Sequence, residues 1–436
     1  GVGMYLFMAD LGSKRSAFIA AVAYLFAPYF LCALYVRQAL ADFSSFAPLP
    51  YAFWGVYLVA TGKRRALWWV GIAAVSLLML SSNPVALMAI PSLVLWSFWL
   101  GWRARYGKAF LRGFGVILAG LSLSAFFWLP AFAERNLVQT ARLFEGYLNY
   151  RNHFVYPSQF ISLSWGYGLS VAGPKDGMSF SLGPVHLLGI AVTTFFILGN
   201  KQVPRGDRAW HEFFLILCGG AVFLASTLSR SLWDALRILQ YLEFPWRFLT
   251  LAAFSSACLL GGTFHFVERF SPRGNTRLIY GTLIAVAGLL LIWGVPKARP
   301  ERFIALNESH HSPRAIATLG IWVTTAGEYT PIWVQERPTA PAREPLSFIE
   351  GKGVMHAAQV SSISKEFLVE IYEESRLRLN TFYFPGWTLY VNGAERPITY
   401  DNPQGVMEFT LPPGRYEVTF IFRDTPIRLW GQGLSL

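Results

Sequence analysis

The feature that most restricts what this chain can fold into is a series of apolar segments, each about as long as a membrane-spanning helix. Roughly 20 helical residues cross a hydrocarbon core of about 30 Å. Only 14% of the residues are charged and 54% are hydrophobic, whereas soluble domains carry about 25% charged residues. A soluble globular protein is therefore excluded, and the lipid bilayer is the expected partner of residues 1–296. The segments run near 16–36, 45–61, 114–132, 182–199, 211–229, 247–266 and 278–295, after an apolar remnant at 1–10.

A further apolar stretch, 66–100, is too long for one span and is interrupted by Ser81-Ser82-Asn83-Pro84. A proline disfavours the α conformation of the residue before it and fits the first turn of a new helix. We therefore predict a hairpin of two spans with its apex at this sequence. The helical membrane domain then has about nine spans.

The distribution of Lys and Arg over alternate loops predicts the orientation of these spans. Fifteen basic residues fall on one side and eight on the other, although the second side has the longest loop. The first side is therefore expected to be cytoplasmic. Its residues are Lys14, Arg15, Lys63, Arg64, Arg65, Arg103, Arg105, Lys108, Arg112, Lys201, Arg205, Arg208, Arg269, Arg273 and Arg277.

The same distribution argues against nucleic acid as a partner. The formal net charge is +12, but the basic residues form short clusters between apolar segments rather than one basic face. The three cysteines, Cys32, Cys218 and Cys258, lie inside apolar runs and are interpreted as packing residues.

Beyond Pro296 the pattern changes to short alternating runs such as EFLVEIYEE, RLRLNTFYF, GVMEFTLP and RYEVTFIFRD, which predict β-strands. Asn392-Gly393 is a strong two-residue hairpin signal, and Pro412-Pro413-Gly414 marks a second turn. Residues 297–436 are therefore expected to form an all-β, sandwich-like domain with little helix. Because the last span leaves the cytoplasm, this domain should be extracytoplasmic.

The longest connection, 133–181, lies on the outer side and contains many aromatic residues. A loop of this length without obvious regular structure is usually functional or disordered, and the aromatic content argues against disorder. Trp165 and Tyr167, in its WGYG run, are candidates to stack on a sugar ring or a lipid. Simple anchoring at the membrane interface is the alternative reading.

Charged residues at the outer ends of spans are the main site candidates, because a charge near hydrocarbon is costly unless it is paired or used. An arginine can hold a phosphate with its planar fork, and a carboxylate can act as a base. Structural ion pairs between Arg37 and Asp42, and between Glu243 and Arg247, are the alternative. The catalytic candidates are Asp42, Glu134 and Glu243, and the substrate-binding candidates are Arg37, Arg135, Arg247, Trp246, Trp165 and Tyr167.

No sequence motif for a nucleotide, a serine nucleophile or a zinc protease site is present. The seven histidines form no metal motif, and the adjacent His310 and His311 would point to opposite faces of a strand. No cofactor is therefore assigned, although a divalent metal remains compatible with the acidic candidates.

Several separate blocks of the sequence carry a resemblance to known proteins. The runs YVRQALADF, LSSNPVALM, FWLPAFAERNLVQ, GYLNYRNHFVYPSQF and FPWRFL, with WGYG and GPKDGMSFSLGPVHL, resemble the bacterial membrane proteins labelled 6-pyruvoyl-tetrahydropterin synthase-related. That label does not imply pterin chemistry. The C-terminal runs GEYTPIWV and FYFPGWTLYVNG resemble the extracytoplasmic end of YfhO-like proteins.

This resemblance implies a GT-C-like glycosyltransferase in the bacterial cytoplasmic membrane. Such an enzyme takes a sugar from a polyprenyl-phosphate donor on the outer face and modifies an envelope glycan or lipid acceptor. The family's catalytic acid usually lies in a first outer loop, which we expect upstream of Gly1 because the chain begins inside an apolar stretch and reads as a fragment.

Two other function classes were weighed. A non-enzymatic protein that binds or transports lipid-linked glycans, with the β domain holding the polymer, remains open. An ion-coupled transporter would need acidic residues near mid-membrane and an internal repeat, and neither is evident. For the donor site we predict an outer rim that surrounds phosphate and sugar and is roofed by 146–180. The rim residues are Arg37, Asp42, Glu134, Arg135, Glu243 and Arg247.

Overall fold

The computed structural model describes residues 1–199, 203–271, 275–305, 307, 309, 312, 315, 327–338 and 342–436. They form two compact units. The first contains Gly1–Trp128 and Phe144–Phe303, and also Ser435. The second contains Leu129–Leu143 and Ile304–Leu434, and also Leu436, so part of the predicted outer loop packs with the C-terminal unit.

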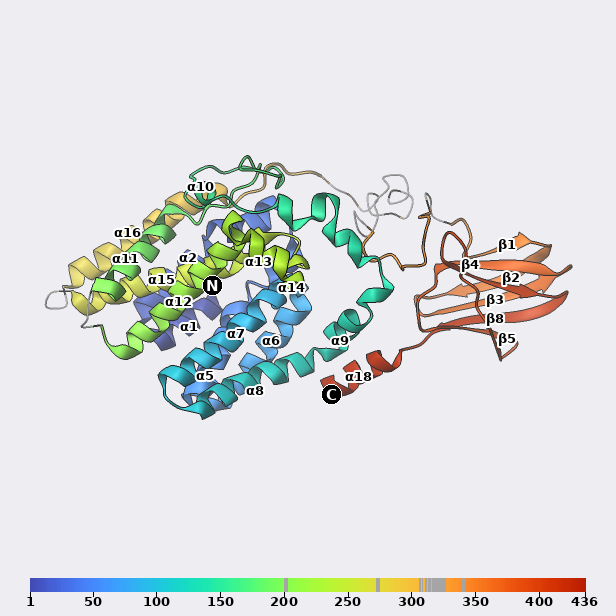
Figure 1. The fold of residues 1–436 in the computed structure, drawn as a ribbon, viewed down its shortest axis with the longest axis horizontal. Helices are drawn as coiled ribbons and strands as arrows, with labels where there is room; N and C mark the ends of the chain where they lie inside the picture. The colour runs from blue at the N-terminus through green and yellow to red at the C-terminus, as the bar shows by residue number, and fades with distance from the viewer. Residues whose placement is uncertain are drawn as a thin grey trace. The chain divides into compact units, whose positions relative to one another are not determined.

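The first unit is helical (Figure 1). Its N-terminal half contains α1 (Val2–Leu11), α2 (Lys14–Leu25), α3 (Pro28–Leu31), α4 (Leu40–Ser44), α5 (Pro48–Thr61), α6 (Trp68–Ser81), α7 (Asn83–Arg103) and α8 (Gly107–Leu123). Next come α9 (Ala125–Ala133), which runs into the second unit, α10 (Pro157–Phe160), α11 (Pro184–Gly199), α12 (Arg205–Ala225), α13 (Arg230–Ala235), α14 (Arg237–Gln240), α15 (Leu249–Phe270) and α16 (Thr276–Gly294).

Four of the described helices are long and apolar enough to cross a membrane, or up to six if each of two bent pairs is one span. Fewer helices meet this length than the nine spans predicted, because other apolar segments form shorter helices, such as Trp68–Ser81 and Pro184–Gly199. The loop predicted at 133–181 is not featureless, since it contains four short 3-10 turns between Arg135 and Asn152 and the helix α10.

Two predicted segments are not straight helices. Segment 16–36 bends by 43° between α2 and α3, where Ala27 is extended before Pro28, as the steric effect of a proline on the preceding residue requires. Segment 114–132 bends by 75° between α8 and α9. There the Ser124 hydroxyl donates to the carbonyl oxygen of Gly120, and the helix restarts at Ala125.

The helix break predicted at Ser81–Pro84 is confirmed, although of the two helices only α7 is long enough for a span. Helix α6 ends at Ser81 and α7 begins at Asn83, and the Ser82 hydroxyl accepts the backbone N–H of Val85 as an N-cap. Pro84 lies in the first turn of α7, where its missing N–H has no intrahelical partner to lose.

The core of the helical unit is rich in aromatic side chains around α15. Phe254 of α15 stacks on Phe7 of α1 at 6.1 Å and lies 4.7 Å from the ring of Phe53 of α5. Elsewhere α5 and α6 approach closely at Gly55 and Gly71, since a Cβ on Gly55 would meet the Cα of Gly71 at 2.2 Å. Small residues at such a crossing let two backbones touch, as in membrane helix pairs.

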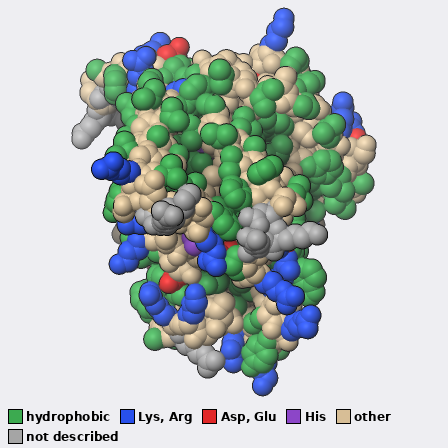
Figure 2. Space-filling view, turned by 90° about the vertical axis from the view of Figure 1, so that its left-hand side faces the viewer, with side chains coloured by type: hydrophobic (Ala, Val, Ile, Leu, Met, Phe, Trp, Pro, Cys, Tyr) green, Lys and Arg blue, Asp and Glu red, His purple; other side chains and the backbone are tan. Residues whose placement is uncertain are grey.

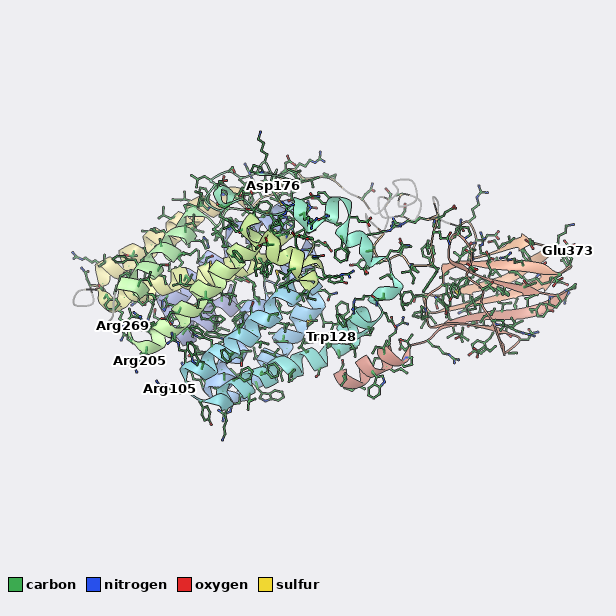
Figure 3. All side chains as sticks on the ribbon, viewed as in Figure 1. Arg105, Trp128, Asp176, Arg205, Arg269 and Glu373 are labelled. Carbon is green, nitrogen blue, oxygen red and sulfur yellow. The ribbon has the colours of Figure 1, made fainter. Side chains whose placement is uncertain are left out.

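Basic side chains gather at one end of the helical unit. Figure 2 faces that end and shows Lys and Arg side chains, mostly in its lower half, with few Asp or Glu. Figure 3 labels Arg105, Arg205 and Arg269 there, and Asp176 at the other end. The three arginines come from alternate loops, as the predicted orientation requires; Lys201 and Arg273 lie outside the described residues.

The second unit is built on two antiparallel sheets with one shared core (Figure 1). One sheet has the order β1-β4-β7 and the other β2-β3-β8-β5-β6. Alternate residues of both sheets, such as Phe367, Leu377, Phe409 and Phe420, point into the core. The strands are β1 (Leu346–Glu350), β2 (Gly353–Val360), β3 (Ser364–Ile371), β4 (Ser375–Phe382), β5 (Trp387–Val391), β6 (Ala394–Arg396), β7 (Val406–Leu411) and β8 (Gly414–Phe422).

The four predicted strand runs correspond to β3, β4, β7 and β8, and both predicted turns are confirmed. Asn392 and Gly393 have φ of 50° and 78° and join β5 to β6, as a type I′ turn requires. The expectation of little helix omitted α18 (Pro426–Ser435), which ends the chain. Glu134, from the 129–143 segment of the same unit, accepts hydrogen bonds from Thr425 and Arg428 at its start.

Candidate functional site

The charged residues predicted at the outer ends of spans meet at one place in the helical unit. Helix α3 continues into a π-helical turn, Cys32–Val36, which ends directly before Arg37. A π-turn shifts the register of the following side chains and is frequent at functional sites. Gln38, next to Arg37 in the sequence, and Glu243 have φ of 51° and 59°, in the region that non-glycine residues rarely adopt.

Asp42 is the centre of the cluster. One of its carboxylate oxygens accepts a hydrogen bond from Arg37 Nη2 at 2.8 Å and lies 3.4 Å from Arg247 Nε. The other accepts the hydroxyl of Ser82, the α6–α7 hairpin residue, at 2.7 Å. The Asp42 side chain is only 8% exposed. Its three contacts therefore connect separate segments of the chain inside the protein.

The second carboxylate, Glu243, pairs with Arg247 at 3.2 Å. Arg247 Nη1 also donates to the backbone carbonyl of Leu242, and the short helical turn Pro245–Phe248 carries the arginine into α15. Arg247 Nε is buried and makes no hydrogen bond of good geometry to any described residue, although Asp42 is near. The two ion pairs given above as the structural alternative, Arg37–Asp42 and Glu243–Arg247, therefore both exist, and the contact between Asp42 and Arg247 joins them.

Trp246 forms an aromatic platform beneath Arg37. The guanidinium of Arg37 lies 4.3 Å from the centre of the indole ring, a favourable cation–π distance. The same guanidinium donates from Nη1 to the hydroxyl of Tyr29 at 2.9 Å. Phe244 and Phe180 stack on the indole, with ring centres 4.7 and 5.9 Å away.

The 146–180 segment, predicted as a roof, contacts this platform. The indole N–H of Trp246 donates to the hydroxyl of Ser170 at 3.2 Å, and Ser170 is 2.9 Å from His153 Nδ1. Because the Ser170 hydroxyl accepts the hydrogen bond from the indole N–H, it can donate its own proton in a hydrogen bond to His153. Burial lowers the pKa of the His153 imidazole. This series of hydrogen bonds fixes the position of the indole ring.

The cluster holds two positive and two negative side chains, each at most 17% exposed. Burial alone would raise the pKa of Asp42. The charges of Arg247 and Arg37, with the hydrogen bonds from Arg37 and Ser82, outweigh burial and hold the pKa of Asp42 below its ordinary value. Asp42 is therefore a weak base that keeps two guanidiniums in place.

The remaining predicted site residues have other contacts. Glu134 and Arg135 belong to the second unit, where Glu134 binds Arg428 and Arg135 donates to the carbonyl of Phe132 at 2.6 Å. Within the described residues, Trp165 and Tyr167 touch each other edge to face, with no ring contact to the Trp246 platform. Tyr167 donates to the carbonyl of Arg299.

No group of three or more His, Cys, Asp or Glu side chains that could hold a metal occurs in the part of the chain that the structure describes. His310 and His311 lie outside the described residues. The cysteines Cys32, Cys218 and Cys258 are buried free thiols, as the packing interpretation predicted.

The contributors that the sequence did not predict include Tyr29, Ser82 and Ser170. Each is a common residue without a motif, and only Ser82 had a signal, as the apex of the hairpin. Comparisons of the whole chain with protein families, curated proteins and solved structures find no match.

Proposed function

We propose that this chain is a multi-pass protein of the bacterial cytoplasmic membrane that binds a polyprenyl-phosphate-linked sugar and transfers it to an envelope glycan or lipid. The observation that carries the proposal is the buried cluster of Arg37, Asp42, Glu243 and Arg247 at one end of an apolar helical unit. The basic end would be cytoplasmic, and the β domain extracytoplasmic. A GT-C-like fold is part of the proposal.

Helix α16 supports a lipid environment. It is the most apolar of the four long helices, yet only 17% of its apolar 18-residue stretch is buried inside the protein. Its exposed side chains include Ile284, Leu289 and Ile292. An apolar surface of this kind needs a nonaqueous neighbour, and lipid tails provide one.

The location of the cluster also fits an outer-face donor site. Ser82, which binds Asp42, precedes the first residue of α7, and Arg103 is the last residue of the same helix. A helix of 21 residues is about 30 Å long, which matches the hydrocarbon thickness. The cluster therefore lies one membrane thickness from the basic end of α7.

Two guanidiniums next to each other suit a phosphate. Each guanidinium has five N–H donors in a fixed fork, and in the described contacts Arg37 uses donors toward Tyr29 and Asp42 only. The indole of Trp246 and the carboxylate of Asp42 hold the fork of Arg37 before a ligand arrives. Such preorganisation lowers the entropic cost of binding.

Among the catalytic candidates, Glu243 fits best. Asp42 has a lowered pKa and is poorly suited to accept a proton from an acceptor hydroxyl. Glu243 lies at the edge of the cluster on a strained backbone, the kind of position that active sites often retain. Glu134 is engaged with Arg428 in the second unit.

A non-enzymatic role in binding or transporting a lipid-linked glycan is the second candidate. The observation that favours it is the complete pairing of both carboxylates with arginines, which suits binding better than proton transfer. An assay with a radiolabelled polyprenyl-phosphate sugar separates the two. Transfer that is lost in Glu243→Gln supports the enzyme, whereas donor binding without any transfer supports the carrier.

The donor site is tested at Arg247. Binding of undecaprenyl phosphate to the full chain in nanodiscs is measured for the parent, Arg247→Lys and Arg247→Ala. Lysine keeps the charge but loses the planar fork, so affinity should fall about tenfold, and further in the alanine variant. Arg269→Lys, a half-exposed arginine of the same unit paired with Asp207 and outside the proposed site, is the matched control.

If both Arg247 variants bind undecaprenyl phosphate as the parent does at equal expression, Arg247 is only the structural partner of Glu243. The proposed site then loses its main anchor.

A further inference from the structure

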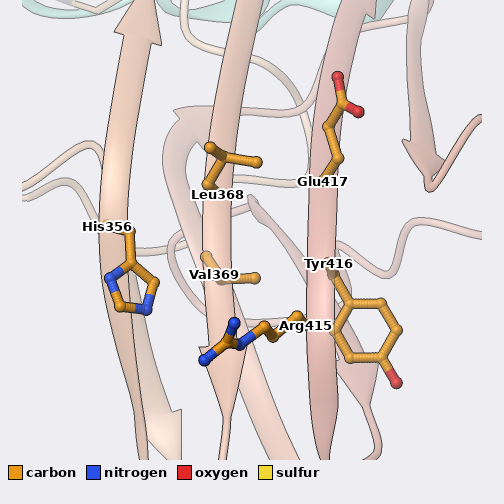
Figure 4. Close-up of a pocket in the computed structure, with 6 residues that line it drawn as sticks. All are labelled: His356, Leu368, Val369, Arg415, Tyr416 and Glu417. Carbon is orange, nitrogen blue, oxygen red and sulfur yellow. The ribbon is translucent and has the colours of Figure 1, made fainter.

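The outer face of the five-stranded sheet carries a second arrangement of polar side chains, separate from the charged cluster of the helical unit. A depression of about 370 Å³ is lined by residues of β2, β3 and β8, and Figure 4 shows these side chains on the three strands. This volume is at the small end of the roughly 300–1,000 Å³ found for ligand pockets. Its lining residues are His356, Leu368, Val369, Arg415, Tyr416 and Glu417.

A β-bulge places His356 in this depression. Met355 pairs with Val369 and Ala357 pairs with Leu368, so His356 is an extra residue in β2 with no partner in the β3 register. A bulge redirects a side chain without ending the strand, and bulges are frequent next to binding sites. Here the redirected imidazole reaches Glu370 on β3, with 2.9 Å between Nε2 and the carboxylate.

Glu370 holds both a histidine and an arginine. Its second oxygen accepts a hydrogen bond from Arg415 Nε of β8 at 3.0 Å. These two contacts lower the pKa of Glu370, with the bond from Arg415 as the larger cause. The carboxylate therefore fixes His356 and Arg415 on two neighbouring strands, one on each side of β3.

The contacts with Glu370 leave other groups of the depression open to a ligand. Because a carboxylate can only accept hydrogen bonds, the His356 Nε2 that contacts Glu370 is the donor of that bond. The Arg415 side chain is 81% exposed, and its Nη groups are donors beyond the bond from Nε. Glu417 adds a carboxylate acceptor, and Leu368, 50% exposed, adds an apolar surface.

Donors and acceptors that alternate beside an apolar surface match a pyranose, which has hydroxyl groups around its rim and C–H groups on its faces. The carboxylates of Glu370 and Glu417 outnumber the single guanidinium of Arg415, and this negative excess disfavours an anionic ligand. We propose that this depression is a binding subsite for one unit of a neutral glycan. The inference deepens the proposed function, because a glycan acceptor would present such units to the β domain.

The test uses the full chain in nanodiscs with maltotriose and chitotriose as probes and trigalacturonate as a charged comparison. Binding is measured by calorimetry, and carbethoxylation of His356 is followed by peptide mass spectrometry. A neutral trisaccharide should bind and protect His356 from the reagent. Glu370→Gln and Arg415→Gln should each weaken binding about tenfold, as expected for loss of a hydrogen bond to a charged group.

Glu366→Gln is the matched control. Glu366 is on the same strand as Glu370 and on the same face of the sheet, but it does not line the depression. This variant should bind as the parent does. The subsite is refuted if no neutral trisaccharide binds or protects His356, if trigalacturonate alone binds, or if Glu366→Gln weakens binding as much as Glu370→Gln. Undecaprenyl phosphate binding, measured in parallel, should be unchanged by all three substitutions, so failure of the subsite is distinguishable from failure of the donor site.

Discussion

At the scale of single residues, Asp42 decides whether the charged cluster can exist. It contacts Arg37, Arg247 and Ser82 with a side chain that is 8% exposed. Burying a guanidinium without a counter-charge costs several kcal/mol, so the two arginines depend on the two carboxylates. Removing one carboxylate therefore tests the whole arrangement.

We expect Asp42→Asn to destabilise the helical unit by about 3 kcal/mol, in the range found when one partner of a buried ion pair is removed. Thermal unfolding of the full chain in detergent at neutral pH is the measurement. Asp234→Asn makes the same chemical change at an exposed pair with Arg151 and should have a much smaller effect. Equal effects of the two substitutions would show that the Asp42 cluster adds no special stability.

The same residue gives a pH dependence with a defined sign. The folded-state pKa of Asp42 is lowered, so its contribution is complete above the unfolded-state pKa of about 3.9 and is lost as the pH falls through the lower folded-state value. The difference in melting temperature between the parent and Asp42→Asn should thus be constant from about pH 5 to 7 and shrink below about pH 4. A difference that grows on acidification would contradict this assignment.

The sequence predicted part of this cluster and could not predict the rest. Arg37 and Asp42 share a short loop, and i,i+4 spacing predicts the pair Glu243–Arg247 if the segment is helical. The pair exists, but Glu243 has φ of 59° and lies before the turn Pro245–Phe248, so a helix is not what forms it. The contact between Asp42 and Arg247 joins residues about 200 positions apart, and only tertiary packing creates it. Glu134 matched the same pattern of a charge at the end of a span, but the bend after Ser124 precedes a segment that packs with the C-terminal unit.

At the scale of elements, strands and turns were easier to predict than helix geometry. A strand has a two-residue period and a turn needs particular φ values, so short sequences specify both. Helix bends are harder to predict from the sequence. Pro28 marks the 43° bend, whereas the 75° bend occurs at Ser124, where the sequence has no proline. Apolar composition also gives no sharp helix end, which is why several predicted spans are shorter helices.

Two glycines of the β domain separate backbone strain from steric clash. Gly393, in the β5–β6 turn, has φ of 78° and open space around a built Cβ, so Gly393→Ala should cost only about 1 kcal/mol. Gly386 has φ of 122°, and its Cβ would meet the carbonyl oxygen of Arg423 at 2.4 Å. Gly386→Ala should therefore cost clearly more.

Hydrogen exchange of peptides from β5 and β8 in the full chain measures both effects. Exchange in these peptides should increase slightly in Gly393→Ala and strongly in Gly386→Ala. The reverse order would mean that the turn, rather than the close approach at Gly386, limits the stability of this sheet.

At the scale of the whole molecule, the proposed membrane orientation rests on where basic residues gather. Arg105, Arg205 and Arg269 lie at one end of the helical unit (Figure 3), although they come from three different loops. Lys and Arg in short loops are retained on the cytoplasmic side. In the proposed orientation, the apolar helix α16 leads out of the cytoplasm to the residues before the β domain.

Cysteine labelling tests this orientation in intact cells. The native thiols at Cys32, Cys218 and Cys258 are buried, and replacing all three with alanine gives a background for single cysteines. A membrane-impermeant maleimide should react with Asn392→Cys, which lies in an exposed turn of the β domain, and should react with Arg205→Cys only after the cells are opened. Because both positions are polar and close to helix or strand ends, a difference between them reports the side of the membrane. Labelling of Arg205→Cys but not Asn392→Cys in intact cells would invert the orientation and move the charged cluster to the cytoplasmic face, where a donor on the outer face could not reach it.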